Sequence, residues 1–336
     1  RENNILRMKQ YYNDYINKLG RQNIPFLFVI NYKGDDAIIK PLEEINDTEI
    51  KYDFNGITND SSTPIKNERD ISWNIDMPTR ESYAKGFNIV KKNIMAGNSY
   101  LANYTCSVPV KTNMSMEYIF KNSKAKYRIL IKDKLVCFSP ESFIKIKNSR
   151  IYSFPMKGTA DATSPDAKNI LLSDIKESAE HATIVDLIRN DLSKIATNVR
   201  VDKYRYIDYI SNNTGKIIQT SSQISGQLSD DYRQHIGDII ESQLPAGSIT
   251  GAPKKKTVDI IAEAEDYQRG FYTGTMGICI NGNIDSAVMI RFIEKKGDGY
   301  VFKTGGGITS KSDCNKEYNE IKQKIYVPIC RDDKDD

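Results

Sequence analysis

The sequence reads YTGTMGICI over residues 272–280, IDSAVMIRFI over residues 284–293 and YVFK over residues 300–303. These runs are rich in β-branched and aromatic residues, and only short polar stretches separate them, which is typical of successive strands. Strands joined by such short connections pair antiparallel. The three runs therefore predict a meander of antiparallel strands.

The rest of the sequence repeats this arrangement of paired strands. Further pairs are predicted over residues 25–30 with 37–39, 125–131 with 135–138, and 205–210 with 217–224. Helices are predicted at residues 1–22, 79–96, 174–195, 236–242, 254–265 and 315–324, and Gly20 is expected to end the first of them. Because strand, helix and strand do not alternate steadily, the sequence predicts an α+β fold whose large antiparallel sheets are flanked by helices.

The composition of the 336 residues is that of a globular protein, with 39% hydrophobic and 27% charged residues. No apolar run reaches the roughly 20 residues that cross a bilayer, and the first residues do not resemble a signal peptide. The net charge of +4 is spread along the chain without a basic arm, which argues against a nucleic-acid partner. Five scattered cysteines without a C-x-x-C pair favour reduced thiols. We therefore expect a cytoplasmic protein with no nucleic-acid or membrane partner.

Histidine is scarce in the chain, with only His181 and His235. Two histidines argue against a histidine-based zinc site and leave few ways to build a Ser-His-acid triad. Lysine, glutamate and a hard metal ion are therefore the expected chemical tools.

One lysine has an unusual local setting, in Ser153-Phe-Pro-Met-Lys157-Gly-Thr159. Pro155 fixes the approach of the chain and Gly158 permits a tight turn, so the sequence predicts an amine on a stiff, constricted turn. An ordinary surface lysine, one of 48 basic residues, fits the same stretch. This stretch alone therefore does not distinguish a functional lysine from a surface lysine, and the other motifs of the chain are needed.

Two pairs of glutamates share the spacing that places side chains on one face of a helix. They are Glu177 with Glu180 and Glu317 with Glu320, and Lys324 lies one turn beyond the second pair. Such pairs are ordinarily solvated surface. Glu180, however, adjoins the apolar run that begins at residue 182, where an unpaired carboxylate is costly to bury. Two helices that offer carboxylates across a pocket would make an oxygen-ligand site suited to Mg²⁺.

Glycine-rich turns and one arginine suggest where an anion would bind. The stretch over residues 247–254 fails the Walker spacing but leads into a predicted helix, whose free N–H groups suit an anion. Arg291 lies in the predicted strand 284–293, so it either pairs with a carboxylate of the protein or binds one on a ligand. These features suggest a Mg²⁺-dependent enzyme for a small polyanion, with Lys157 as nucleophile or base. A non-catalytic anion-binding protein fits them too.

The motifs resemble those of the chorismate-utilising enzymes, which include anthranilate synthase component I, aminodeoxychorismate synthase component I, isochorismate synthase and salicylate synthase. They follow the family's order over residues 95–327. The stretches that carry the resemblance are Ser139-Pro-Glu141, Pro155-Met-Lys157-Gly-Thr159, Ala179-Glu180-His181, residues 184–191, residues 247–254, Tyr272-Thr-Gly-Thr-Met-Gly277, Ile290-Arg291 and residues 305–313 with Glu317 and Glu320.

The resemblance implies a single large α/β sandwich with two antiparallel sheets and outer helices. Residues 1–90 look like a shortened amino-terminal segment packed on the same fold, residues 91–330 like the chorismate-binding catalytic region, and residues 331–336 like a charged tail. The Leu-Leu-Glu-Ser element that family members use for regulatory tryptophan is absent from the sequence.

The resemblance also implies roles for individual residues. Glu180 and Glu320 look like Mg²⁺ ligands, and Glu177 and Glu317 look like nearby carboxylates that hold water. Arg291 and Tyr272, with the backbone N–H groups near Gly306, look like the groups that bind the enolpyruvyl carboxylate. Further substrate contacts are implied for Thr250, Lys324 and Thr159. Arg189, Asn190 and Asp191 are expected to be mostly structural.

Two positions separate the branches of the family. Aminodeoxychorismate synthases resemble this chain in carrying lysine at position 157, where the other branches carry alanine. The isochorismate and salicylate branches use a lysine to activate water at the position of Leu101, and leucine cannot do so. Gln219 stands where the family often has histidine, which weakens anthranilate formation as an alternative. The resemblance therefore points to aminodeoxychorismate synthase component I.

The expected mechanism follows from this branch. Lys157 would attack C2 of chorismate while Glu141 delivers a proton to the departing C4 hydroxyl, and ammonia would then displace the lysine. The sequence shows no glutaminase Cys-His-Glu region, so a glutamine amidotransferase subunit is expected to supply the ammonia. Anthranilate synthase component I and a non-catalytic chorismate-binding module remain the alternatives.

Overall fold

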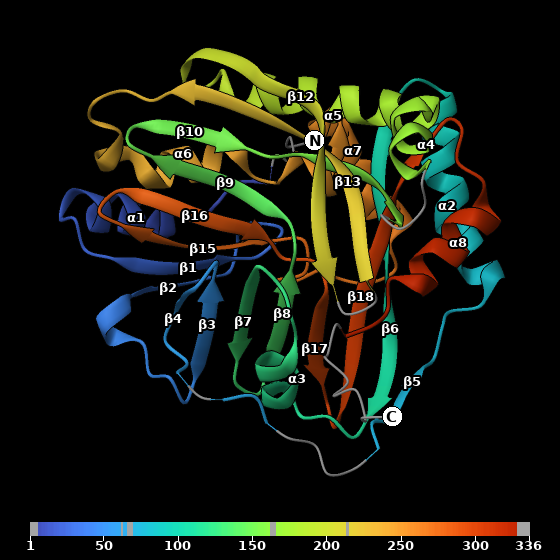
Figure 1. The fold of residues 1–336 in the computed structure, drawn as a ribbon, viewed down its shortest axis with the longest axis horizontal. Helices are drawn as coiled ribbons and strands as arrows, with labels where there is room; N and C mark the ends of the chain where they lie inside the picture. The colour runs from blue at the N-terminus through green and yellow to red at the C-terminus, as the bar shows by residue number, and fades with distance from the viewer. Residues whose placement is uncertain (1–5, 62, 66–69, 162–165, 213–214, 328–336) are drawn as a thin grey trace.

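The computed structural model describes residues 6–61, 63–65, 70–161, 166–212 and 215–327 (Figure 1). Within them the strands form two nine-stranded antiparallel sheets. The first sheet contains β1 (Phe26–Ile30), β2 (Ala37–Pro41), β9 (Ser142–Lys147), β10 (Arg150–Ser153), β11 (Met156–Asp161), β12 (Thr197–Asn212), β13 (Gly215–Gln227), β15 (Thr275–Ile280) and β16 (Asn283–Val288). The second contains β3 (Ile50–Phe54), β4 (Ile57–Thr58), β5 (Trp73–Ile75), β6 (Leu101–Thr112), β7 (Tyr127–Ile131), β8 (Leu135–Ser139), β14 (Gly251–Ala252), β17 (Phe292–Lys296) and β18 (Gly299–Thr309).

Neighbouring strands follow the order β11-β13-β10-β9-β16-β15-β1-β2 in the first sheet, where β12 pairs with β13. The order in the second sheet is β14-β6-β18-β17-β8-β7-β3-β4, and β5 pairs with β6. The helices are α1 (Gln10–Arg21), α2 (Arg80–Met95), α3 (Met116–Asn122), α4 (Ala167–Ser173), α5 (Ile175–Leu192), α6 (Ile236–Gln243), α7 (Lys254–Ala264) and α8 (Cys314–Gln323), with 3₁₀ turns η1 (Leu42–Glu44), η2 (Tyr232–His235) and η3 (Gly247–Ile249). The predicted α+β fold with two large antiparallel sheets is confirmed.

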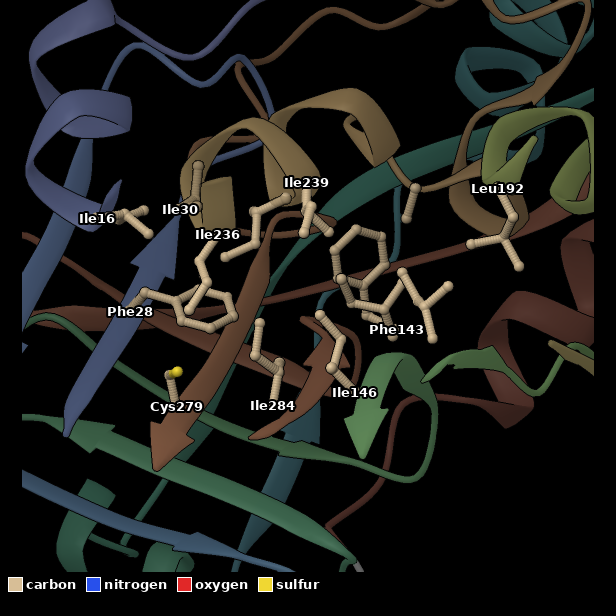
Figure 2. Close-up of a cluster of buried hydrophobic side chains, with 14 of the residues drawn as sticks. Ile16, Phe28, Ile30, Phe143, Ile146, Leu192, Ile236, Ile239, Cys279 and Ile284 are labelled. Carbon is tan, nitrogen blue, oxygen red and sulfur yellow. The ribbon is translucent and has the colours of Figure 1, made fainter. Parts of the chain in front are cut away.

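Strand β1 shows how the sandwich is held together, because all five of its residues are buried. Phe26, Phe28 and Ile30 belong to a cluster that includes Ile16 of α1 and Ile236 of α6 (Figure 2). The alternate residues Leu27 and Val29 belong to a cluster formed by strands of both sheets. Successive side chains of a strand point to opposite faces, so one strand packs against helices on one side and against the second sheet on the other. Each fully buried apolar side chain of this kind contributes about 1.5–3 kcal/mol.

Helices α2, α7 and α8 cover the second sheet, and Figure 1 shows α2 and α8 beside β6 and β18. Their apolar residues pack with those of these two strands in a third cluster that contains Phe87, Val108, Ile260, Phe302 and Ile321. No helix in the described residues combines the length and the hydrophobicity needed to cross a membrane.

The expectation that Gly20 ends the first helix is wrong. Helix α1 runs from Gln10 to Arg21, and Gly20 lies inside it. A Cβ atom at Gly20 would stand 2.2 Å from the carbonyl oxygen of Arg233, so the glycine permits a close approach between α1 and η2. Residues 1–5 of the predicted helix lie outside the described residues.

The predicted strand over residues 284–293 is also wrong, because the chain changes sheets within it. Strand β16 ends at Val288 in the first sheet, and β17 begins at Phe292 in the second. Arg291 stands at this crossover with a φ of +54°, a conformation that L-residues rarely adopt. The run has no glycine or proline to mark the break, which is why its sequence resembles one continuous strand.

Candidate active site

The stretch around Lys157 forms an irregular edge of the first sheet. Strand β11 pairs with β13, with Lys157 opposite Thr220 and Thr159 opposite Gln219, and the register shifts between these pairs. Gly158 has a φ of +69° at that shift. The expected tight turn is therefore a bulged strand, because antiparallel pairing continues on both sides of the glycine. The side chains of Lys157 and Thr159 lie outside the described part of the structure.

Helix α5 places carboxylates beside this strand. The carboxylate Oε2 of Glu177 would be 3.4 Å from a Cβ atom built at Gly158, so Glu177 lies directly over the lysine stretch. Asp174 caps the helix by accepting the N–H of Glu177 at 2.9 Å. Glu180, one turn further, is buried with 8% of its surface exposed. Glu177 of the predicted pair on α5 thus lies next to the stretch that contains Lys157.

His181 and Ser222 fasten α5 to the sheet. The fully buried His181 ring places Nε2 2.6 Å from the hydroxyl of Ser222, and that hydroxyl accepts the backbone N–H of Arg205 at 2.9 Å. Gln219, on the same strand as Ser222, is buried and donates a long bond of 3.5 Å to Ser221. The imidazole in this region therefore comes from α5 and not from position 219.

Four predicted residues gather where α8 meets β18. The Glu317 carboxylate and the Lys324 amine would lie 3.6 and 3.7 Å from a Cβ atom built at Gly306. Lys324 Nζ stands 2.7 Å from Glu320 Oε1 and donates to the carbonyl oxygen of Gly305 at 3.2 Å. Glu317 is 3% exposed, whereas the Glu320 side chain is 53% exposed. The glycine-rich strand thus lets both charged groups approach its backbone.

Arg291 and Tyr272 lie close to this group. Arg291 donates to the carbonyl oxygen of Lys324 at 3.5 Å, and its guanidinium lies 5.2 Å from the ring centre of Tyr326. Neither of these two contacts is made with a carboxylate. Burial raises the pKa of Tyr272, so its hydroxyl stays protonated and can donate a hydrogen bond.

Glu141 lies in a small pocket that Pro155, two residues before Lys157, also lines. The hydroxyl of Ser248 donates to Glu141 Oε1 at 2.5 Å. Thr250, two residues on, is fully buried, and its hydroxyl donates to the carbonyl oxygen of Ala246 at 2.9 Å. That hydroxyl is therefore engaged inside its own turn. Sequence reasoning missed Ser248, because no local pattern links it to a residue 107 positions away.

The segment over residues 247–254 is anchored by a buried ion pair. Lys254 Nζ lies 2.5 Å from Asp191 Oδ2 and also donates to the carbonyl oxygen of Gln243. Burial lowers the pKa of Lys254, and the Asp191 carboxylate opposes that effect. Asp191 is 3% exposed, which agrees with the structural role expected for it.

A second buried ion pair was not anticipated. Arg269 makes two bonds to Glu265, at 2.8 and 2.6 Å, and its side chain is 2% exposed. The same guanidinium donates to the carbonyl oxygens of Asn103 and Ile249. The four-residue spacing between Glu265 and Arg269 indicates a possible ion pair in the sequence, but it does not indicate whether that pair is buried. This pair joins the segment after α7 to β6 and to η3.

The residues expected to hold Mg²⁺ fit the ion in the kind of donor they offer. Glutamate oxygens are the ligands Mg²⁺ prefers, and one or two carboxylates with water and substrate suffice. Over the described ranges no three histidine, cysteine, aspartate or glutamate side chains converge as a metal cluster. A four-carboxylate cage is therefore not what the described residues offer, whereas one carboxylate from each helix remains compatible with Mg²⁺ chemistry.

Gly251→Ala is expected to destabilise the protein by about 3 kcal/mol or more, because a Cβ atom there would be 1.9 Å from the carbonyl oxygen of Leu101 and the φ is +129°. Gly56→Ala is the control, since its φ of +93° adds strain in open space and is expected to cost only about 1 kcal/mol. Urea denaturation of both variants measures the difference. Equal losses would contradict the close approach of β14 to β6.

Comparison with known proteins gives a consistent result. The family described as chorismate binding enzyme matches residues 27–329. An uncharacterized PabA-like protein of Haemophilus influenzae is 44% identical over 323 residues, which cover 95% of this chain and 97% of that protein. Aminodeoxychorismate synthase component 1 of Bacillus subtilis is 28% identical over 264 residues, which cover 74% of this chain and 54% of that protein.

A solved structure agrees with these relatives. Anthranilate synthase component I from Streptococcus pneumoniae superposes with a TM-score of 0.66 at 25% identity. The superposition covers 79% of this chain and 60% of that one. The two-sheet sandwich found here is therefore similar to that of a known enzyme fold.

Proposed function

The chain belongs to the family of chorismate binding enzymes, and we propose that it acts as aminodeoxychorismate synthase component I. The proposed reaction converts chorismate and ammonia to 4-amino-4-deoxychorismate, on the way to p-aminobenzoate and folate. A glutamine amidotransferase subunit is the proposed source of the ammonia.

The observation that carries this proposal is Lys157 in the stretch Pro155–Thr159, where the resembling enzymes of the other branches carry alanine. The backbone of Lys157 lies in β11, and the same strand passes over Glu177 at Gly158. Leu101 supports the assignment, because it is 3% exposed at the position where two other branches need a lysine to activate water. An apolar side chain cannot take a proton from water.

In the proposed mechanism the neutral amine of Lys157 attacks C2 of chorismate. Glu141 gives a proton to the C4 hydroxyl, which leaves as water while the ring double bond shifts. Ammonia then adds at C4, the double bond shifts back and the lysine leaves. Covalent catalysis replaces one difficult displacement by two easier ones, and a positioned acid contributes roughly 10²–10⁴-fold.

The remaining predicted residues are proposed to hold the substrate. Arg291 and Tyr272 would bind the enolpyruvyl carboxylate together with backbone N–H groups near Gly306. Lys324 and Thr159 are further candidates for substrate contact, whereas the hydroxyl of the third candidate, Thr250, is already engaged with the carbonyl oxygen of Ala246. Glu180 and Glu320 would hold Mg²⁺, with Glu177 and Glu317 holding its waters, and the ion would neutralise the ring carboxylate.

Anthranilate synthase component I is the second candidate, and the similarity to the S. pneumoniae enzyme favours it. The two functions start from the same substrates and differ in the product. Gln219 weakens this candidate, because glutamine cannot act as a titratable base where the family often has histidine.

Product identification separates the candidates. The purified chain is incubated with chorismate, Mg²⁺ and ammonium, and the products are separated and identified by mass spectrometry and fluorescence. The expected product is 4-amino-4-deoxychorismate. Fluorescent anthranilate, formed without an added lyase, would replace the proposal by the second candidate, and no product would favour a chorismate-binding module.

A further inference from the structure

Ser248 forms a short hydrogen bond to the carboxyl group of the proposed general acid. Its hydroxyl donates to Glu141 Oε1 at 2.5 Å, although the two residues are 107 positions apart. Both residues line the same small pocket, together with Ser153 and Pro155 of the segment that leads into β11. The contact therefore lies next to the lysine stretch and not in a remote part of the fold.

The turn that carries Ser248 is firmly held. Ser248 is the central residue of η3. The carbonyl oxygen of the next residue, Ile249, accepts hydrogen bonds from Arg269 at 3.0 Å and from Asn103 at 3.1 Å. A Cβ atom at Gly247 would stand 2.8 Å from Leu187, so the turn is packed tightly against α5. The Ser248 hydroxyl is thus presented from a fixed backbone.

The backbone of Glu141 is fixed as well. Its N–H donates to the hydroxyl of Ser139 at 3.1 Å, and its carbonyl oxygen accepts the N–H of Val288 at 3.1 Å. With both backbone groups engaged, the carboxyl group can change its orientation only by rotation of the side chain. The bond from Ser248 restricts that rotation.

We propose that Ser248 is a positioning residue that orients the carboxyl group of Glu141 for proton delivery, an inference that rests on the proposed function. A hydroxyl that donates to Oε1 limits the orientations that the plane of the carboxyl group can take. The same bond is stronger to the ionised carboxylate than to the acid, so it makes Glu141 a stronger acid. Ser248 thereby sets both the direction and the ease of the proton transfer.

Charged groups near Glu141 also influence the pH at which its carboxyl group titrates. Asp191 of α5 lines the same pocket, and it is already paired with Lys254 and Lys194. Lys157 follows Pro155, which lines the pocket, by two residues and is the nucleophile of the proposed reaction. Neither residue is changed by a substitution at Ser248.

Ser248→Ala is expected to lower kcat about tenfold with little change in the KM for chorismate, because positioned acid catalysis supplies roughly 10²–10⁴-fold in total. The alkaline limb of the pH–rate profile should move to higher pH, since the ionised form of Glu141 loses a donor. Ser248→Thr keeps the hydroxyl and should restore the wild-type rate and profile.

Ser142→Ala is the matched control, because Ser142 lines the same pocket but its hydroxyl donates to the carbonyl oxygen of Ser286. It should leave the position of the alkaline limb unchanged. An unshifted limb in Ser248→Ala, or an equal loss in Ser248→Thr, would overturn the inference.

A measurement without turnover separates this inference from the proposed function. Protein labelled with ¹³C at the glutamate carboxyls is titrated by NMR, and Glu141→Gln identifies the Glu141 signal. Ser248→Ala should raise the pH at which that signal titrates, whichever product the enzyme makes. An unchanged titration would overturn the role of Ser248, whereas a wrong product would overturn only the proposed function.

Discussion

Lys157→Ala is expected to lower the formation of 4-amino-4-deoxychorismate on the order of 10³-fold, because the covalent route is lost with the amine. The physical reason is that ammonia would then have to displace the C4 hydroxyl without the lysine-linked intermediate. The rate is measured with chorismate, Mg²⁺ and ammonium at saturating concentrations. Lys147→Ala is the control, since Lys147 is an exposed lysine of β9 in the same sheet.

Intact-protein mass spectrometry tests the covalent step itself. Wild-type protein with chorismate but no ammonia should gain the mass of chorismate less one water, because the C2–N bond forms as the C4 hydroxyl leaves. Lys157→Ala should gain nothing, and Lys147→Ala should behave like wild type. If wild type makes product yet never shows the adduct, Lys157 acts as a base and the nucleophile assignment is wrong.

Glu265→Ala is expected to cost about 3–5 kcal/mol of folding stability, the penalty for removing one partner of a buried ion pair. Burial alone would lower the pKa of Arg269, but the Glu265 carboxylate, together with Tyr32 and Tyr267, raises it, so the guanidinium stays charged. The substitution leaves that charge buried at 4% exposure without its partner. The free energy of unfolding from urea denaturation measures the loss.

Glu117→Ala supplies the matched control for this prediction. Glu117 and Lys121 form a pair with the same four-residue spacing at 3.2 Å, but the glutamate side chain is 48% exposed. Exposed pairs contribute about 0–1 kcal/mol, so this variant should be almost as stable as wild type. Similar losses in both variants would mean that burial does not set the strength of the Glu265–Arg269 pair.

Periodicity and composition were enough to predict the elements that lie in the core. The run Phe26–Ile30 has no polar residue, and it forms a strand buried on both faces. Thr79 and Asp174 were expected to start helices, and both accept a backbone N–H at a helix N-terminus. Local chemistry determines these features, so a local pattern reveals them.

Features that depend on distant partners could not be predicted in the same way. Gly20 resembles a helix stop in the sequence, but the structure needs glycine there because the carbonyl oxygen of Arg233 leaves no room for a Cβ atom. The change of sheet before Phe292 has no local marker, and the contact between Ser248 and Glu141 joins two separate motifs. Family motifs indicated which side chains to examine, but only the fold shows which of them meet.

The crossover between β16 and β17 has a consequence for how the sequence can change. The three residues between Val288 and Phe292 join the two sheets and also place Arg291 beside Lys324. An insertion or deletion there would shift the register of β17 against β8 and β18 and displace the guanidinium at the same time. The length of this connection is therefore fixed by two independent demands. Engineered insertions belong elsewhere, for example at the exposed turn around Gly56, where the backbone has open space.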